Sequence, residues 1–292
     1  MAYERWDIEQ LILKHAPPKY RPLAKFIKRV LHQGNFARFL ESCKDIEGQD
    51  FIREIIRFFD VKVKYCGIEN VPEKGRYIFA TNHPLGGLDG VCLLGLIFSR
   101  FGEVKAVVNE LLLYIENLKP VFAGVNIYGR FKKSQLVALD ELFRSNNYIL
   151  VFPAGVVSIF RKGKVQDLPW HKSFVVKALQ HKRDIVPVCA DARNSFLFYL
   201  VATLRRFFRS DVSFESFLLP NEMFRFKGKE IRFYFGKPIS WTHFTSERST
   251  MKWVEEIRQT VENLRKTDQP MKSFSYEEIL QSSKTRPIID GR

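Results

Sequence analysis

The chain has 292 residues, of which 46% are hydrophobic, and its 47 lysines and arginines outnumber 32 aspartates and glutamates to give a formal net charge of +15. This composition is that of a folded protein rather than a disordered one, and it suits one large α/β domain or such a domain with a helical extension. The positive charge predicts an anionic partner, for which membrane phospholipid, nucleic acid and an acidic carrier protein are the candidates.

The cysteines and the apolar runs restrict the class of protein further. The four cysteines are widely separated and none forms a Cys-x-x-Cys pair, so we expect neither a zinc site nor a disulfide framework, and a reducing compartment fits. The first residues are polar and charged, unlike a signal peptide, and no run of about 18 uncharged apolar residues occurs. We therefore expect a soluble or peripheral protein, cytoplasmic and bound to the inner face of the plasma membrane.

Regular elements are expected along the whole chain from the spacing of apolar residues. Strands are predicted at 61–66, 75–81, 104–109, 148–152, 184–190 and 230–236. Helices are predicted at 7–14, 23–31, 35–43, 49–59, 89–100, 110–117, 134–144, 196–209 and 250–265.

The chain is organised around residues 81–90, which read Thr-Asn-His-Pro-Leu-Gly-Gly-Leu-Asp-Gly and join a predicted buried strand to an apolar helix. His83 and Asp89 are six residues apart, which on a regular helix would place them about 240° from one another. A contact between them therefore requires a bend, which Pro84 and the flexible pair Gly86-Gly87 permit.

If the contact forms, Asp89 accepts a hydrogen bond from one ring nitrogen of His83 and leaves the other nitrogen as a general base. The simpler alternative is a polar loop, in which the histidine satisfies a backbone group and the aspartate caps the helix.

The stretch 81–90 resembles the His-Asp block of the glycerolipid (lysophospholipid) acyltransferase superfamily. Four residues usually separate the two catalytic residues there, whereas five do here, and this longer form is similar to the hemolysin-like bacterial branch. That branch includes enzymes that N-acylate glycine or ornithine to make aminolipids. The resemblance implies that His83 and Asp89 are catalytic and that Asn82, Gly86 and Gly87 contact the substrate.

A second stretch, residues 124–130, resembles the block of the superfamily whose arginine is assigned to the anionic head of the acceptor, which implies that role for Arg130. A guanidinium group can hold a phosphate or a carboxylate through two parallel hydrogen bonds. The alternative is an exposed arginine in a basic loop beside Lys132 and Lys133.

Residues 153–158 resemble the third block, which usually reads Phe-Pro-Glu-Gly-Thr. Ala154 stands in place of the glutamate, which weakens the assignment of a glycerophosphate acceptor. Pro153, Gly155 and Ser158 are candidate substrate-binding residues, because the glycine lets backbone N–H groups approach a ligand and the serine hydroxyl can bond it. The serine could equally be a local cap.

The basic segment 161–174 also resembles the bacterial branch, in which Asp, Trp, Lys and Phe recur after the third block. Arg161 and Lys172 are candidate ligands for an anionic group of donor or acceptor, with a solvated basic face as the alternative. Residues 184–190 resemble the fourth block, a strand on the acyl-binding side. At about 14 residues, the stretch 196–209 is too short to span a bilayer, so it is either an interfacial helix with arginines at the headgroups or a buried helix with a basic end.

The resemblance implies an α/β fold, a mixed β-sheet flanked by helices with an N-terminal helical extension. We expect a helical segment at 1–60, an acyltransferase domain at 61–268 and a loose polar tail at 269–292. It also implies transfer of an acyl chain from a thioester on acyl carrier protein or coenzyme A, without a covalent acyl-enzyme, and with no bound cofactor or metal.

Three functions remain open from the sequence. The preferred one is N-acylation of an amino acid such as glycine or ornithine, favoured by the spacing of His83 and Asp89 and by Ala154. The second is O-acylation of a lysophospholipid such as 1-acylglycerol-3-phosphate, favoured by Arg130 as a phosphate ligand. The third is a non-catalytic basic protein that binds lipid or nucleic acid. The sequence contains no nucleic-acid-binding motif, so we expect partners to be the thioester donor, a small acceptor and an anionic membrane surface.

Overall fold

The computed structural model describes residues 33–125, 133–207 and 214–278. The helices predicted at 7–14 and 23–31, and the candidate ligand Arg130, lie outside these described residues.

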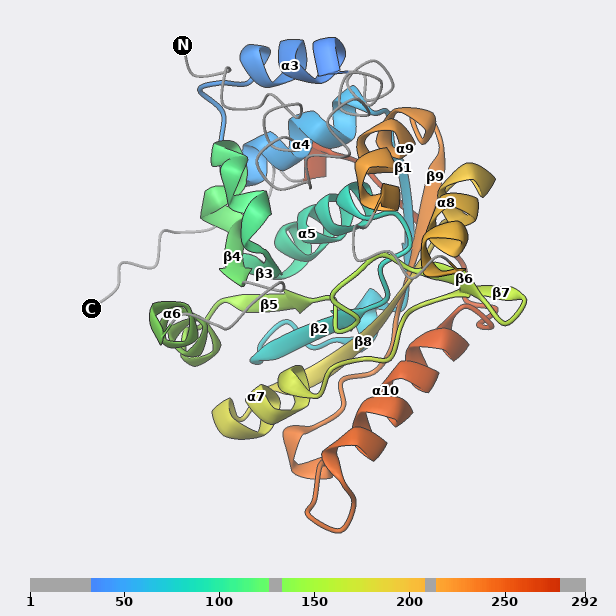
Figure 1. Ribbon diagram of the computed structural model, residues 1–292. Coiled ribbons are helices and arrows are strands. Elements are labelled where there is room, and N and C mark those ends of the chain that lie inside the picture. Colours follow the sequence, from blue (N-terminus) through green and yellow to red (C-terminus); the bar gives the residue numbers. More distant parts are fainter. Residues whose placement is uncertain (1–32, 126–132, 208–213, 279–292) are drawn as a thin grey trace.

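A mixed sheet of eight strands runs through the molecule in the order β10-β1-β9-β8-β2-β5-β3-β4 (Figure 1). Its strands are β1 (Lys62–Cys66), β2 (Tyr77–Thr81), β3 (Val104–Asn109), β4 (Phe122–Val125), β5 (Tyr148–Val151), β8 (Asp184–Asp191), β9 (Glu230–Phe235) and β10 (Lys272–Phe274). The strand β2 pairs in parallel with β5 and β8, and β3 pairs in parallel with β4 and β5. Two antiparallel pairs, β8 with β9 and β1 with β10, make the sheet mixed. A separate hairpin consists of β6 (Ile159–Arg161) and β7 (Lys164–Gln166).

Helices cover both faces of this sheet. They are α3 (Gln33–Ser42), α4 (Gly48–Phe58), α5 (Gly87–Phe101), α6 (Lys133–Arg144), α7 (Ser173–His181), α8 (Phe196–Phe207), α9 (Leu219–Arg225) and α10 (Thr250–Leu264). The helices α3, α4 and α5 share one hydrophobic core with the sheet, and α6, α7 and α10 share the other. The fold class expected from the sequence is confirmed.

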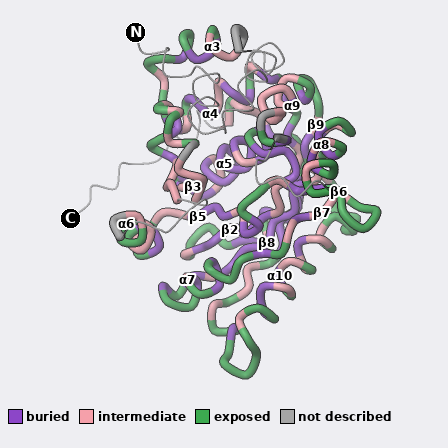
Figure 2. The backbone as a smooth tube through the Cα atoms, viewed as in Figure 1, coloured by how far each residue is buried: buried purple, intermediate pink, exposed green. Residues whose placement is uncertain are grey.

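The central strand β2 explains why two cores form. All five of its residues are buried, as expected of a parallel strand that is covered on both faces (Figure 2). Because side chains alternate along a strand, Tyr77 and Phe79 enter the core of α5, whereas Ile78 and Ala80 enter the core of α7 and α10. His83 follows directly after this strand, so it lies at the edge where the parallel strands end.

The described part of the N-terminal segment packs into the main core. The ring of Phe39 on α3 lies 5.7 Å from that of Phe51 and 4.4 Å from that of Phe58, both on α4, and α4 packs against α5. At the other end, the sequence predicted a loose tail after residue 268, and this is wrong for β10. Phe274 is buried, and it pairs with Val63 of β1 at the edge of the sheet.

One predicted helix is also wrong. Residues 110–117 form two short 3₁₀ turns, Glu110–Tyr114 and Glu116–Val121, instead of an α-helix. The amide of Asn117 donates hydrogen bonds to the carbonyls of Cys43 and Ile46, so contacts with the N-terminal segment fix this stretch in an irregular path. Among the described residues, we find no helix with the length and apolar content needed to cross a membrane.

Candidate active site

The turn between β2 and α5 brings His83 and Asp89 into contact. His83 Nδ1 lies 3.0 Å from Asp89 Oδ2, although the two residues are six positions apart. Gly86 makes the bend possible, because it adopts a φ of +89° immediately before α5 begins. Asp89 lies in the first turn of α5, where the helix dipole favours a carboxylate.

The hydrogen bonds of Asp89 determine which ring nitrogen of His83 carries the proton. Asp89 is buried, and its oxygens accept hydrogen bonds from the backbone N–H of Leu85 at 3.0 Å and of Gly90 at 2.8 Å. A carboxylate held by N–H donors acts as an acceptor, so His83 Nδ1 donates to it. Among the described residues no hydrogen bond reaches His83 Nε2, which remains available to a substrate. The ring of Phe152 packs on that of His83 with 4.0 Å between centroids.

The backbone of His83 is held on both sides by the segment after β5. The carbonyl of His83 accepts a hydrogen bond from the backbone N–H of Ser158 at 2.8 Å. The N–H of His83 donates to Asp167 Oδ1 over 3.4 Å. The same carboxylate accepts hydrogen bonds from Ser158 Oγ and, at 2.9 Å, from Trp170 Nε1. Asp167 is therefore a buried acceptor that joins three segments around the turn between β2 and α5.

Two buried carboxylates change the acid–base properties of the site. Burial by itself lowers the pKa of His83, but the charges of Asp89 and Asp167 and the hydrogen bond that His83 donates to Asp89 more than offset this effect, so the pKa is raised above its usual value near 6.5. Burial also raises the pKa of Asp167, against the lowering effect of its hydrogen bonds with Ser158, Trp170 and the His83 backbone.

Residues at the end of β8 and just after it also form hydrogen bonds with the turn. Asn194 Nδ2 donates to the carbonyl of Pro84 at 3.1 Å, and the backbone N–H of Asn194 donates to Tyr199 Oη at 3.1 Å. The side chain of Asn82 bonds both the N–H and the carbonyl of Ala190, each at 2.8 Å. Each residue from 82 to 84 is thus tied to a neighbouring segment.

The structure brings some of the candidate substrate-binding residues to the turn and leaves others apart from it. Gly86 and Gly87 are at the start of α5, and none of the described hydrogen bonds uses their backbone N–H groups. Asn82 and Ser158 lie at the turn, but their side chains bond Ala190 and Asp167.

The other candidates lie farther along the chain. Pro153 is buried, and its carbonyl accepts a hydrogen bond from the N–H of His171 at 2.9 Å; Gly155 has a φ of +68° in the same loop. Arg161 and Lys172 are exposed, and within the described residues neither forms a hydrogen bond or ion pair with the turn. Their predicted roles stay predictions.

Asp167 and Asn194 are the site residues that the sequence analysis did not assign. Asp167 belongs to the segment 161–174 that resembles the bacterial branch, and this was the signal that could have singled it out. Asn194 carried no such signal, because its contact with Pro84 joins residues 110 positions apart.

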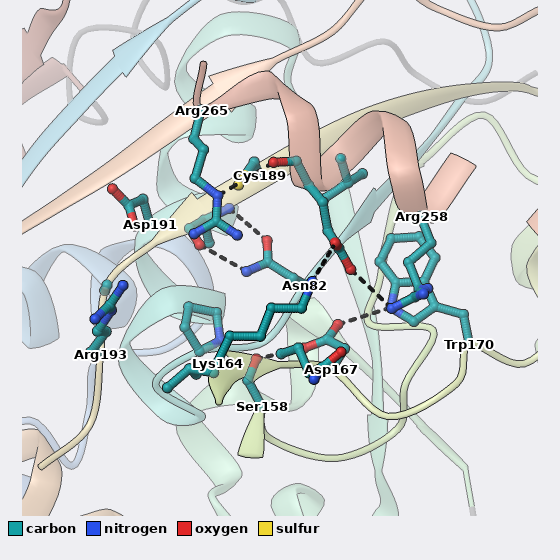
Figure 3. A pocket seen from close by; sticks show the side chains of 17 residues that line it. Asn82, Ser158, Lys164, Asp167, Trp170, Cys189, Asp191, Arg193, Arg258 and Arg265 are labelled. Carbon is teal, nitrogen blue, oxygen red and sulfur yellow. Dashed lines mark hydrogen bonds and ion pairs between the residues drawn. The ribbon is translucent and has the colours of Figure 1, made fainter. Parts of the chain in front are cut away.

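A polar pocket opens beside the turn, between α10, the β6–β7 hairpin and the end of β8 (Figure 3). Asn82, Ser158 and Asp167 form its wall on the side of the turn, while His83 itself is not part of the lining. Its charged lining comprises the cations Lys164, Arg193, Arg258 and Arg265 and the acids Asp167, Asp191 and Glu262.

Two of the pocket's cations are free to bind an anion. Arg258 is already paired with Glu255 and Glu262, and Lys164 lies 3.3 Å from Glu262. Arg193 and Arg265 have no acidic partner among the described residues, so they can accept an anionic group. No set of three His, Cys, Asp or Glu side chains suited to a metal ion occurs in the part of the chain that the structure describes.

Comparison with known proteins identifies the family. Residues 12–269 match the family described as acyltransferase. The chain belongs to this acyltransferase family. A protein of Bacteroides thetaiotaomicron named lyso-glycine lipid O-acyltransferase is 36% identical over 264 residues, which cover 88% of this chain and 97% of that relative. A protein of the same name from Phocaeicola vulgatus is 33% identical over 263 residues, covering 88% of this chain and 94% of the relative.

A solved structure, that of the 1-acyl-sn-glycerophosphate (LPA) acyltransferase PlsC from Thermotoga maritima, aligns with 92% of this chain and all of that one, at a TM-score of 0.45 and 18% identity. The resemblance drawn from the sequence is confirmed by the family and the two relatives: the acyltransferase is a glycerolipid-type enzyme of the aminolipid branch, and it acts in lipid synthesis.

Proposed function

We propose that this acyltransferase moves a fatty acyl chain from a thioester onto the hydroxyl of a lyso-aminolipid, an acceptor of the lyso-glycine lipid type. The observation that carries the proposal is the contact of 3.0 Å between His83 Nδ1 and the buried carboxylate of Asp89. It fixes the tautomer in which His83 Nε2 is a base.

In the proposed reaction the acceptor oxygen attacks the thioester carbonyl while His83 Nε2 removes its proton. Asp89 stabilises the imidazolium that forms. The tetrahedral intermediate then expels the thiolate, which takes the proton from His83, so the ester bond forms as the thioester bond breaks and the enzyme is regenerated. The unused N–H groups of Gly86 and Gly87 at the start of α5 are the proposed donors to the oxyanion.

The name of both relatives, lyso-glycine lipid O-acyltransferase, favours oxygen over nitrogen as the acceptor atom. The longer His-Asp spacing and Ala154 favour an amine instead. The same base can deprotonate either group, and the geometry of the dyad alone does not distinguish them. N-acylation of an amino acid therefore remains the second candidate, and O-acylation of a lysophospholipid the third.

The donor and the location of the enzyme are part of the proposal. We expect the thioester to be carried by acyl carrier protein or coenzyme A, since both present anionic groups to a protein of net charge +15. We place the enzyme on the inner face of the plasma membrane, where such donors and lipid acceptors meet.

The test is the identity of the product. Purified enzyme is given acyl carrier protein or coenzyme A loaded with one acyl chain, together with a hydroxyacyl-glycine, free glycine, free ornithine and lysophosphatidic acid. Mass spectrometry of the lipids is expected to show an ester of the hydroxyacyl-glycine, absent with His83→Ala. An N-acyl amino acid or phosphatidic acid as the main product would contradict the proposed acceptor.

A further inference from the structure

The outer face of α8 carries an apolar stripe that no described element covers. Its exposed members are Phe196, Leu197, Leu200 and Leu204, of which Phe196 is 79% exposed. Counted from Phe196, the other three lie 1, 4 and 8 residues along the helix, all within an arc of about 100°. The opposite side of α8 presents Phe198, Tyr199 and Ala202, which are buried. The helix α8 therefore carries apolar side chains on its solvent-facing side as well as on its buried side.

The hairpin next to α8 extends this surface. The strand β6 packs against α8 (Figure 1), and Arg206 Nη1 donates to the carbonyl of Phe160 at 3.4 Å. Phe160 is 45% exposed, and Val156 just before the hairpin is 40% exposed. We call these two residues and the stripe on α8 the α8 surface. Apolar side chains exposed together in this way mark an interaction site.

Several cations are neighbours of the α8 surface along the chain. Arg161 and Lys162 follow Phe160, Arg193 precedes α8, and Arg206 lies on the helix beside the stripe. All four are exposed, and none has an acidic partner among the described residues. Apolar side chains with a rim of free cations suit the interface of an anionic bilayer, where the rings and aliphatic chains enter the acyl region and the cations meet headgroups.

A second group of exposed apolar residues provides a contrast. On α6 and α7, Leu136, Val137, Val176 and Leu179 are also exposed. That group borders a groove whose acids Asp140 and Glu141 are balanced by the cations Arg144 and Lys177, so it lacks the excess of free cations that would attract an anionic bilayer. Charge therefore selects the α8 surface over the α6–α7 face.

The α8 surface is joined directly to the catalytic turn. On α8, the hydroxyl of Tyr199 accepts a hydrogen bond from the backbone N–H of Asn194. The side-chain amide of Asn194 donates in turn to the carbonyl of Pro84. On the hairpin side, Ser158 donates to the carbonyl of His83. Val157 and Leu219 lie against Gly86, with a Cβ at that position falling 3.3 Å from Val157 Cγ2. Hydrogen bonds thus join α8 and the segment before the hairpin to the turn that holds His83, and Val157 packs against that turn at Gly86.

We propose that the α8 surface docks the enzyme on an anionic lipid bilayer and places the turn between β2 and α5 at the membrane, so that the lipid acceptor reaches His83 without leaving it. The role of the acceptor rests on the proposed function, but the docking itself is measured without any reaction.

The experiment compares two double variants of the full chain, Phe196→Ser/Leu200→Ser on α8 and Leu136→Ser/Val137→Ser on α6. Both remove two exposed apolar side chains. Binding is measured by flotation with vesicles of phosphatidylcholine alone or mixed with phosphatidylglycerol. We expect the α8 variant to lose binding to anionic vesicles by about tenfold or more. The α6 variant is expected to bind as the wild type does. Equal binding by all three proteins, or an equal loss in both variants, overturns the proposal.

A labelled cysteine reports insertion directly. The four native cysteines are buried, so a cysteine introduced by Leu204→Cys can be labelled selectively with an environment-sensitive dye, with Leu136→Cys as the control. The dye at 204 is expected to shift to the blue with anionic vesicles and the dye at 136 is not. If instead the dye at 204 responds only to protein concentration, and the α8 variant changes the oligomeric state, the surface is an interface between copies and the proposal fails.

A third measurement separates docking from chemistry. On an acceptor dispersed in detergent micelles, the α8 variant is expected to keep the wild-type rate, and on vesicle-bound acceptor it is expected to be slower. Loss of vesicle binding with no activity on any acceptor in the wild type would leave docking supported and the proposed function refuted. A variant that binds vesicles normally refutes docking whatever its activity.

Discussion

The carboxylate of Asp167 accepts a hydrogen bond from the backbone N–H of His83 over 3.4 Å, and it does so from a buried position in a different segment of the chain. The position of His83 therefore depends on a residue outside the turn that contains His83 and Asp89. Asp167 fixes the backbone of the histidine, and Asp89 fixes its ring.

Asp167 contributes a charge as well as a hydrogen bond. Replacing it with asparagine keeps the size of the side chain and removes the charge that helps to raise the pKa of His83. We expect Asp167→Asn to lower kcat by about tenfold or more and to move the acid limb of the pH–rate profile to lower pH. Asp140→Asn is the matched control, because Asp140 pairs with Lys177 and His181 away from the turn. An unchanged acid limb in Asp167→Asn would show that this residue has only a structural role.

The raised pKa of His83 sets the pH range of the reaction. A general base must be neutral, so the rate falls as the pH drops through the pKa of His83. Since burial lowers that pKa less than Asp89 and Asp167 raise it, the acid limb of kcat/KM is expected above about pH 6.5. The profile is measured with an acceptor and a donor that do not titrate in this range. A limb at or below the usual value for histidine would contradict the raised pKa of His83, and a profile without an acid limb would contradict its assignment as the base.

The site also depends on the backbone conformation of Gly86. Its φ of +89° disfavours any side chain, and a Cβ there would approach Leu219 Cδ2 to 3.1 Å. We expect Gly86→Ala to destabilise the protein by about 1–3 kcal/mol and to reduce activity by more than the loss of folded protein explains.

Gly163 in the β6–β7 hairpin is the control for this substitution. It also has a positive φ, of +77°, but nothing lies within 4 Å of its Cβ position. Gly163→Ala is expected to cost about 1 kcal/mol and to leave the rate unchanged. Urea unfolding and kcat are measured for both variants, and equal losses of kcat would argue against a special role for the bend at Gly86.

The contact between His83 and Asp89 could be predicted from the sequence because its signals were local. A buried strand, two glycines and an apolar helix within one stretch were enough to predict a bend that joins His83 to Asp89. Most long elements were also predicted to within two residues, since their apolar periodicity comes from facing one of the two cores.

The parts that could not be predicted depend on distant residues. The strand β10 is only three residues long and forms because Phe274 finds a buried position beside β1. The hydrogen bond from the backbone N–H of His83 requires Asp167, which is 84 positions away in the sequence. The irregular path of residues 110–121 follows from the bonds of Asn117 to Cys43 and Ile46. A local sequence pattern does not show which distant residue each of these groups contacts.

Arg183 provides a test of the fold itself. This arginine is fully buried, and its guanidinium donates to the carbonyls of Phe143 in the last turn of α6 and of Ser145 and Asn147 just after that helix. Burial, and then repulsion from Arg76, lowers its pKa to about 10, so it stays charged at neutral pH.

Removing this arginine takes the described donor from the carbonyl of Asn147 and leaves the carbonyls of Phe143 and Ser145 with Arg76 alone. We expect Arg183→Met to destabilise the protein by about 3 kcal/mol or more. Arg144→Met removes an exposed arginine that pairs with Asp140 at 3.2 Å and is expected to cost less than about 1 kcal/mol. The free energy of unfolding of both variants is measured in urea. Similar midpoints for the two variants would refute the structural role of Arg183.

The most direct test of the central claim is the single-turnover rate of His83→Ala beside wild type, with thioester donor and hydroxyacyl-glycine acceptor and with folding checked by circular dichroism. The variant is expected to be folded and slower by about 10²- to 10⁴-fold, with an equal defect in the double variant His83→Ala/Asp89→Asn because the two residues act as a unit. A folded His83→Ala variant that keeps the wild-type rate would refute the role of His83 as the general base.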